Sequence, residues 1–228
     1  MNRLQLKTDA KNAMREAHPH PVLVALVYGI IVFAVQAILS MISGLGDLVT
    51  ELITDGSQAL FALGLFVPLL ILSLAGSLVL SFLQLGYVGY TLRVITRQPA
   101  GISDLFSYAR YFLKAWGLGI MISIFIGLWS LLLWVPGIIA SYRYSQAYFI
   151  LAENPDKGIM QCIRESKAMM IGHKMDRFVL DLSFIPWYLL AIITCGLGFI
   201  YVSPYTDITS AAFYRELRDG SAQNGARF

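Results

Sequence analysis

Three ionisable residues stand inside long apolar segments of this 228-residue chain, namely Arg143, Asp181 and Asp207. A charge in the hydrocarbon of a membrane is costly, so such residues are candidates for a functional site. Arg143 and Asp207 lie about seven or eight residues from the ends of their segments, roughly 10–12 Å deep at about 1.5 Å per helical residue. We therefore expect Arg143 and Asp207 to meet as an intramembrane polar pair.

Two interpretations of this pair stay open. In the first, Arg143 and Asp207 form a substrate-anion or proton-coupled site, supported by Tyr144 and Tyr205. In the second, they form a structural ion pair that fixes the register of two helices. Asp181 is a further supporting candidate, although it lies close enough to a segment end to reach the lipid headgroups.

The remaining chemistry-bearing residues do not form a recognisable site. His18, His20 and His173 lack the spacing of metal ligands, and the two cysteines, Cys162 and Cys195, stand apart. Phosphate-binding loops, nucleophile elbows and zinc-binding helix motifs are absent from the sequence. We expect no catalytic residues, no metal site and no cofactor, and we do not expect an enzyme.

The composition is that of a membrane protein. Hydrophobic residues make up 57% of the chain and charged residues 14%, with a mean hydropathy of +0.66. Soluble proteins average about 45–50% apolar and about 25% charged residues, so too little polar surface remains to cover a water-soluble enzyme of this size. The net charge of +3 gives no indication of nucleic-acid binding.

The apolar segments predict an all-α fold, a polytopic helical membrane bundle with about six transmembrane helices. A spanning helix needs about 20 apolar residues. The fourth segment is short, and a re-entrant arm is the alternative to a full crossing there. The predicted spans form a single domain over residues 21–217 and cover residues 21–42, 59–92, 116–134, 138–152, 178–194 and 196–214.

The basic residues predict the orientation of these spans. Short cytoplasmic loops collect Lys and Arg. Residues 44–58 contain no basic residue and three acids, whereas 16 of the 17 Lys and Arg fall in four other segments outside the predicted spans. We therefore expect a multi-pass protein with both termini in the cytoplasm. The segments rich in basic residues are 1–20, 93–115, 153–177 and the C-terminal tail.

Two polar segments and the tail lie outside the predicted spans. Residues 1–20 place an apolar stripe and a basic stripe on one helix, which is typical of an amphipathic interfacial helix on an anionic leaflet. A docking helix for a partner is the alternative. Residues 155–171 predict a cytoplasmic amphipathic helix that folds back on the bundle or the bilayer, and residues 218–228 a flexible cytoplasmic tail. The basic stripe of the first segment is Arg3, Lys7, Lys11 and Arg15, and the apolar stripe is Leu6, Ala10, Ala13, Met14 and Ala17.

The second half of the chain carries a connected set of motifs, and the start carries a smaller one at Leu6-Lys7 and Ala10-Lys11. Together they resemble an uncharacterised bacterial integral-membrane family, domain of unknown function 975. That family is distantly similar to the membrane domain of some glycerophosphodiester phosphodiesterases. The resemblance implies a bacterial cytoplasmic-membrane protein and assigns no catalytic residue. The motifs of the second half are Pro136-Gly137-Ile138-Ile139-Ala140, Arg143-Tyr144-Ser145, Asn154-Pro155, Ser166-Lys167, Gly172, Leu182-Ser183-Phe184-Ile185, Trp187, Pro204-Tyr205, Thr209 and Phe213-Tyr214.

These observations lead to two functional expectations. The first is a non-enzymatic accessory or scaffold subunit of the cytoplasmic membrane, which presents its cytoplasmic helix and tail to a protein partner or to anionic lipid. The alternative is a small transporter or lipid-handling protein that uses the Arg143/Asp207 site. We expect no nucleic-acid partner, and the oligomeric state stays open.

Overall fold

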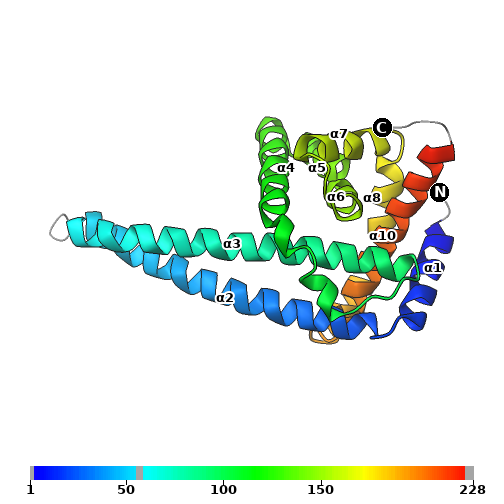
Figure 1. Cartoon of the computed structure of the whole chain (residues 1–228), viewed down its shortest axis with the longest axis horizontal. Helices are drawn as coiled ribbons and strands as arrows, with labels where there is room; N and C mark the ends of the chain where they lie inside the picture. Colours follow the sequence, from blue (N-terminus) through cyan, green and yellow to red (C-terminus); the bar gives the residue numbers. More distant parts are fainter. Residues whose placement is uncertain (1–2, 55–58, 224–228) are drawn as a thin grey trace.

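The helices divide into a long projecting hairpin and a group packed around its base (Figure 1). The computed structural model describes residues 3–54 and 59–223, and within these ranges the fold is all-α, as predicted. The hairpin consists of α2 and α3. The elements are α1 (Arg3–Glu16), α2 (Pro21–Thr54), α3 (Ala59–Ile95), two short 3₁₀ turns (Ile102–Leu105 and Ala109–Tyr111), α4 (Phe112–Leu132), α5 (Trp134–Tyr144), α6 (Ala147–Glu153), α7 (Ile159–Met169), α8 (Lys174–Leu182), α9 (Ile185–Ile193) and α10 (Phe199–Gln223).

Three helical segments are long and apolar enough to cross a membrane: Pro21–Val49, Gly64–Ile95 and Ile102–Leu131. The prediction of membrane-spanning helices is confirmed as far as their length and composition are concerned. Residues 59–92 lie on one helix, α3, as predicted. The finer prediction of about six spans is not shown. Figure 1 also shows α4 standing at a steep angle to the α2–α3 hairpin, on the side of α3, so the three segments do not form a parallel bundle.

The hairpin is longer than the sequence prediction allowed. Helix α2 contains 34 residues and continues to Thr54, so most of the loop predicted over residues 44–58 is helical. Residues 55–58 lie outside the described residues. At about 1.5 Å per residue, α2 is about 51 Å long, well beyond the roughly 30 Å hydrocarbon core of a bilayer.

The fourth and fifth predicted spans each consist of two short helices instead of one. The 138–152 segment breaks between α5 and α6, and the 178–194 segment breaks between α8 and α9. A helix break leaves backbone groups without helical partners. At the first break, the Ser166 hydroxyl donates to the carbonyl of Arg143 at 2.9 Å and accepts from the Gln146 N–H at 3.2 Å. At the second, the Lys7 ammonium donates to the carbonyl of Ser183 at 3.0 Å.

Helix α1 is docked on the protein through its apolar face, and contact of this helix with the membrane surface stays a prediction. Its apolar stripe, including Leu6, Ala10 and Met14, is buried against α10 and α3. The helix itself was predicted correctly, and its apolar face is covered by other helices. The basic side chains of Lys11 and Arg15 remain exposed on the outer face.

The predicted cytoplasmic helix corresponds to α7, and it does fold back on the bundle. Cys162, Ile163 and Met169 are buried, and α7 packs against α6. The helix begins at Ile159, later than the Asn154-Pro155 signal indicated, because the chain forms a turn at residues 155–156 and a bend at residue 157. The predicted flexible tail is also shorter, since α10 continues to Gln223. Residues 224–228 lie outside the described part.

Candidate functional site

The structure does not bring Arg143 and Asp207 together. Arg143 lies half-buried in the last turn of α5. Within residues 3–54 and 59–223, its guanidinium makes no ion pair and no hydrogen bond, and only its backbone carbonyl is engaged, by Ser166. The pairing expected from the similar depths of the two residues is therefore not found.

Asp207 on α10 instead bonds to the hairpin. Its Oδ2 accepts a hydrogen bond of 3.0 Å from the Tyr87 hydroxyl and a longer one of 3.5 Å from the Ser203 hydroxyl. The ring of Tyr28 on α2 stacks on the Tyr87 ring with centroids 4.4 Å apart. Asp207 thus connects α10 to both helices of the hairpin. Nothing in the sequence indicated that Tyr87, which lies in a long uncharged segment, would bond to Asp207.

A polar cavity of about 160 Å³ lies between α8, α9 and α10, and the cation that it contains is Arg177. Arg177 Nε lies 3.3 Å from Asp181 Oδ1, and its Nη2 donates to the Ser210 hydroxyl at 2.9 Å. Both Nε and Nη1 are buried and have no hydrogen-bond partner among the described residues, so the contact with Asp181 is an ion pair without a hydrogen bond. The cavity is lined by Arg177, Asp181, Phe184, Tyr188, Thr206, Asp207 and Ser210.

Of the predicted supporting residues, Asp181 lines this cavity, whereas Tyr144 and Tyr205 are core residues. Tyr144 is buried and packs against Phe125, with ring centroids 5.7 Å apart. Tyr205 makes edge-on contacts with Phe184 and Trp187 at centroid distances of 5.3 and 6.3 Å. These two tyrosines position helices rather than face the cavity.

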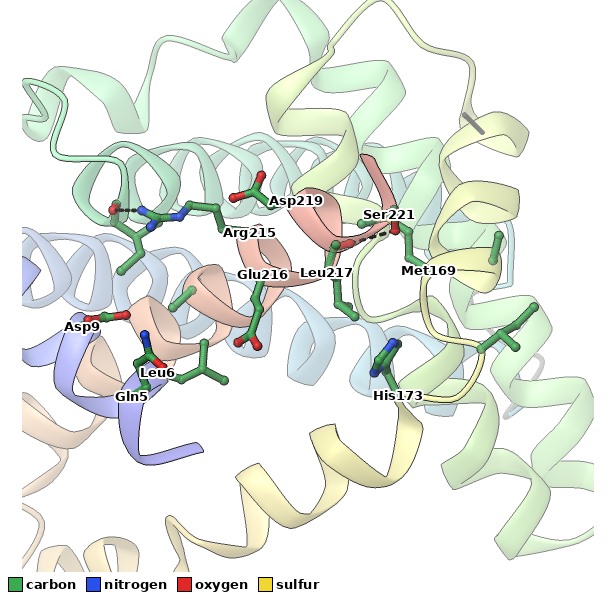
Figure 2. Close-up of a pocket in the computed structure, with 15 residues that line it drawn as sticks. Gln5, Leu6, Asp9, Met169, His173, Arg215, Glu216, Leu217, Asp219 and Ser221 are labelled. Atoms are coloured by element: carbon green, nitrogen blue, oxygen red, sulfur yellow. Dashed lines mark hydrogen bonds between the residues drawn. The ribbon is translucent and has the colours of Figure 1, made fainter. Parts of the chain in front are cut away.

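A larger groove of about 630 Å³ opens between α1, the α7–α8 turn and α10 (Figure 2). The side chains of Leu6, Met169 and Leu217 provide apolar surface in it. Carboxylates of Asp9 on α1 and Glu216 on α10 lie along the same groove, as Figure 2 shows. The groove therefore combines apolar and acidic surface.

The acidic character of the groove is not neutralised by its other charged residues. In the described ranges, Asp9 and Glu216 make no ion pair or side-chain hydrogen bond. The Arg215 guanidinium donates to the Ile95 carbonyl at 2.7 Å, and Figure 2 shows it directed away from Glu216. His173 is engaged with Asp176 at 3.1 Å. Sequence reasoning missed this groove, because Asp9 and Glu216 look like ordinary solvated residues until α1 docks on α10.

The part of the chain that holds the polar cavity also carries the motifs of the second half. Residues 131–221 match the family model described as protein of unknown function, DUF975. The resemblance seen in the sequence is confirmed for this segment. The DUF975 match includes Arg177, Asp181, Asp207 and Glu216, whereas Asp9 and the N-terminal motifs precede it. No curated protein and no solved structure gives a significant match to the chain.

The described part of the chain contains no cluster of metal-ligating side chains. No three His, Cys, Asp or Glu side chains gather there closely enough to hold a metal ion. What the two sites offer is charge and hydrogen bonding: a polar cavity with one guanidinium and two carboxylates, and a groove with unpaired acids beside apolar side chains. Both arrangements suit binding.

Proposed function

We propose that this protein is a non-enzymatic accessory subunit of the bacterial cytoplasmic membrane that holds a partner membrane protein through its acidic groove. The observation that carries the proposal is the pair of unpaired carboxylates, Asp9 and Glu216, beside the apolar side chains of Leu6, Met169 and Leu217. An occupant with Lys or Arg side chains and some apolar surface matches this lining. Segments of that composition flank the cytoplasmic ends of transmembrane helices.

The proposed topology places this groove on the cytoplasmic side. The chain crosses six times, with α5–α6 and α8–α9 as the fourth and fifth crossings and α10 as the sixth. Exposed apolar side chains along α9, including Ile185, Leu189 and Ile193, support lipid contact there. Irregular backbone inside a membrane is tolerated where protein groups satisfy it. Ser166 and Lys7 do this at the two breaks.

The outer face of α1 supports contact with the anionic cytoplasmic leaflet. Arg3, Lys11 and Arg15 are exposed, and Leu4 beside them is 77% exposed. Near an anionic surface each exposed Lys or Arg contributes about 1 kcal/mol of electrostatic attraction. In this proposal α1 packs on the bundle with its apolar stripe and faces lipid headgroups with Arg3, Lys11 and Arg15, so the groove opens close to the membrane surface.

Site-specific photo-crosslinking tests the partner. A photo-reactive amino acid is placed at His173, at the edge of the groove, in the full-length protein in its own cells. We expect a discrete adduct whose crosslinked peptide, identified by mass spectrometry, is basic and adjoins a transmembrane segment. Glu216→Lys and Asp9→Lys should each abolish the adduct, since they place a cation against the basic segment.

The matched control is Asp156→Lys, which makes the same charge change at an exposed acid outside the groove. It should leave the adduct unchanged. An adduct that survives both groove variants, an acidic crosslinked peptide, or no adduct at all would each refute the proposed partner.

A further inference from the structure

The polar cavity between α8, α9 and α10 has an unbalanced charge. Arg177 is already paired with Asp181 at 3.3 Å. Asp207 receives only neutral donors, the hydroxyls of Tyr87 and Ser203. One guanidinium therefore faces two carboxylates in the cavity, and an excess negative charge withdrawn from water is costly, more so within a membrane. An occupant that brings a positive group to Asp207 is therefore favoured.

The Arg177 guanidinium at this cavity keeps hydrogen-bond donors without an acceptor in the described part of the chain. Arg177 Nη1 is buried without a hydrogen-bond partner in the described residues. A buried donor left unsatisfied costs about 1–3 kcal/mol. An occupant with an oxygen near Arg177 removes this cost. A bare metal cation would leave the guanidinium unsatisfied, and a simple anion would face two carboxylates.

Aromatic side chains complete the wall. Phe184 and Tyr188 line the cavity, and the Tyr188 hydroxyl lies 3.5 Å from the Thr206 hydroxyl oxygen. Organic ammonium groups are attracted to aromatic faces. The Phe184 ring already packs against one ammonium, that of Lys7, whose Nζ lies 4.1 Å from the ring centroid. A carboxylate beside aromatic rings thus suits an organic ammonium better than a hydrated metal ion.

We infer that this cavity binds a small zwitterion, with its ammonium at Asp207 and its oxygen-bearing end at Arg177. The cavity volume of about 160 Å³ admits a group of the size of an aminoalkyl phosphate. Such a group is available either as the headgroup of an aminophospholipid in the surrounding bilayer or as a free soluble molecule. This inference does not depend on the acidic groove, which shares no residue with the cavity.

Native mass spectrometry of the full-length protein tests the inference. The protein is reconstituted with equal amounts of phosphatidylethanolamine and phosphatidylglycerol, and retained lipid is counted per chain. We expect one phosphatidylethanolamine per chain. Arg177→Gln and Asp207→Asn should each weaken its retention by about tenfold or more, since each removes one charged contact. Asp156→Asn, an exposed acid outside the cavity, is the control and should retain lipid normally.

Free O-phosphoethanolamine separates the two sources. If it binds the lipid-free protein and displaces phosphatidylethanolamine at equal concentration, the ligand is a soluble zwitterion. If lipid is retained in its presence, the ligand is the headgroup. Equal retention of phosphatidylglycerol, binding of neither probe, or unchanged binding in Arg177→Gln would overturn the inference. If Asp207→Asn does not fold, lipid retention by Arg177→Gln is sufficient to test the inference.

Discussion

The Tyr87 hydroxyl donates a hydrogen bond of 3.0 Å to Asp207 Oδ2, which joins α3 to α10 across 120 residues of sequence. Tyr28 on α2 stacks almost parallel on Tyr87, with an interplanar angle of 7°. The two hairpin helices therefore meet α10 at one point, and that point is at the edge of the polar cavity. Movement of α10 relative to the hairpin would have to break this bond.

Removing the phenol hydroxyl should destabilise the fold. We expect Tyr87→Phe to lower the free energy of unfolding by about 1–3 kcal/mol, because one oxygen of a largely enclosed carboxylate loses its shorter bond. Thermal unfolding in detergent, followed by circular dichroism, measures this. Tyr201→Phe is the control, since Tyr201 is 42% exposed and its hydroxyl makes no hydrogen bond in the described ranges. Equal unfolding temperatures for the two variants would contradict the assigned role.

The hydroxyl of Ser166 should be needed at the α5–α6 break. Ser166→Ala leaves the Arg143 carbonyl and the Gln146 N–H without their partner, so we expect a loss of about 1–3 kcal/mol. Ser141→Ala makes the same change where the hydroxyl bonds only within its own helix, to Ile138, and should cost much less. Urea unfolding of both variants in the same detergent provides the comparison, and similar midpoints would count against the bridging role.

The docked position of α1 can be tested by limited proteolysis. Ala10 is fully buried, so Ala10→Glu should displace α1 and speed tryptic cleavage after Lys7 and Lys11 several-fold. Asn12→Glu adds the same charge on the exposed face and should leave cleavage slow. If both variants are cut at the rate of the wild type, α1 does not depend on packing against α10.

The two cysteines should react very differently with maleimides. Burial, together with the nearby Glu165 carboxylate, raises the pKa of the Cys162 thiol above its ordinary value. A thiol with a raised pKa holds less reactive thiolate at pH 7, and Cys162 is also 0% exposed, so it should stay unmodified. Cys195 is exposed and should be labelled.

The same reagent tests the proposed topology. In intact spheroplasts, a membrane-impermeant maleimide should label Cys195, which the six-crossing map places on the outer side. Cys195→Ser should remove all labelling, and Cys162→Ser should change nothing. Labelling of Cys195 only after the membrane is opened would invert or remove the last two proposed crossings.

Local patterns predicted some elements well and others poorly. The amphipathic pattern of α1 gave the helix correctly but not what covers it, because a protein surface and a lipid surface both accept Leu6 and Met14. The 138–152 and 178–194 segments were predicted as single spans because hydropathy does not reveal a helix break. At both breaks, side chains from distant parts of the sequence bond to the free backbone groups. The pairing of Arg143 with Asp207 failed for a related reason: equal depth in a bilayer does not fix which faces of two helices meet.

The sequence by itself determined that the chain is all-α with helices long and apolar enough to cross a membrane, that residues 59–92 lie on one helix and that residues 131–221 carry a family signature. These properties follow from composition and from short-range spacing, which act within one segment. The tertiary structure alone decided that Asp207 bonds to Tyr87 and lines the same cavity as Arg177. It also decided that Asp9 on α1 and Glu216 on α10 line one groove. Such contacts depend on helix rotation and packing between segments far apart in the chain, and no single segment encodes them.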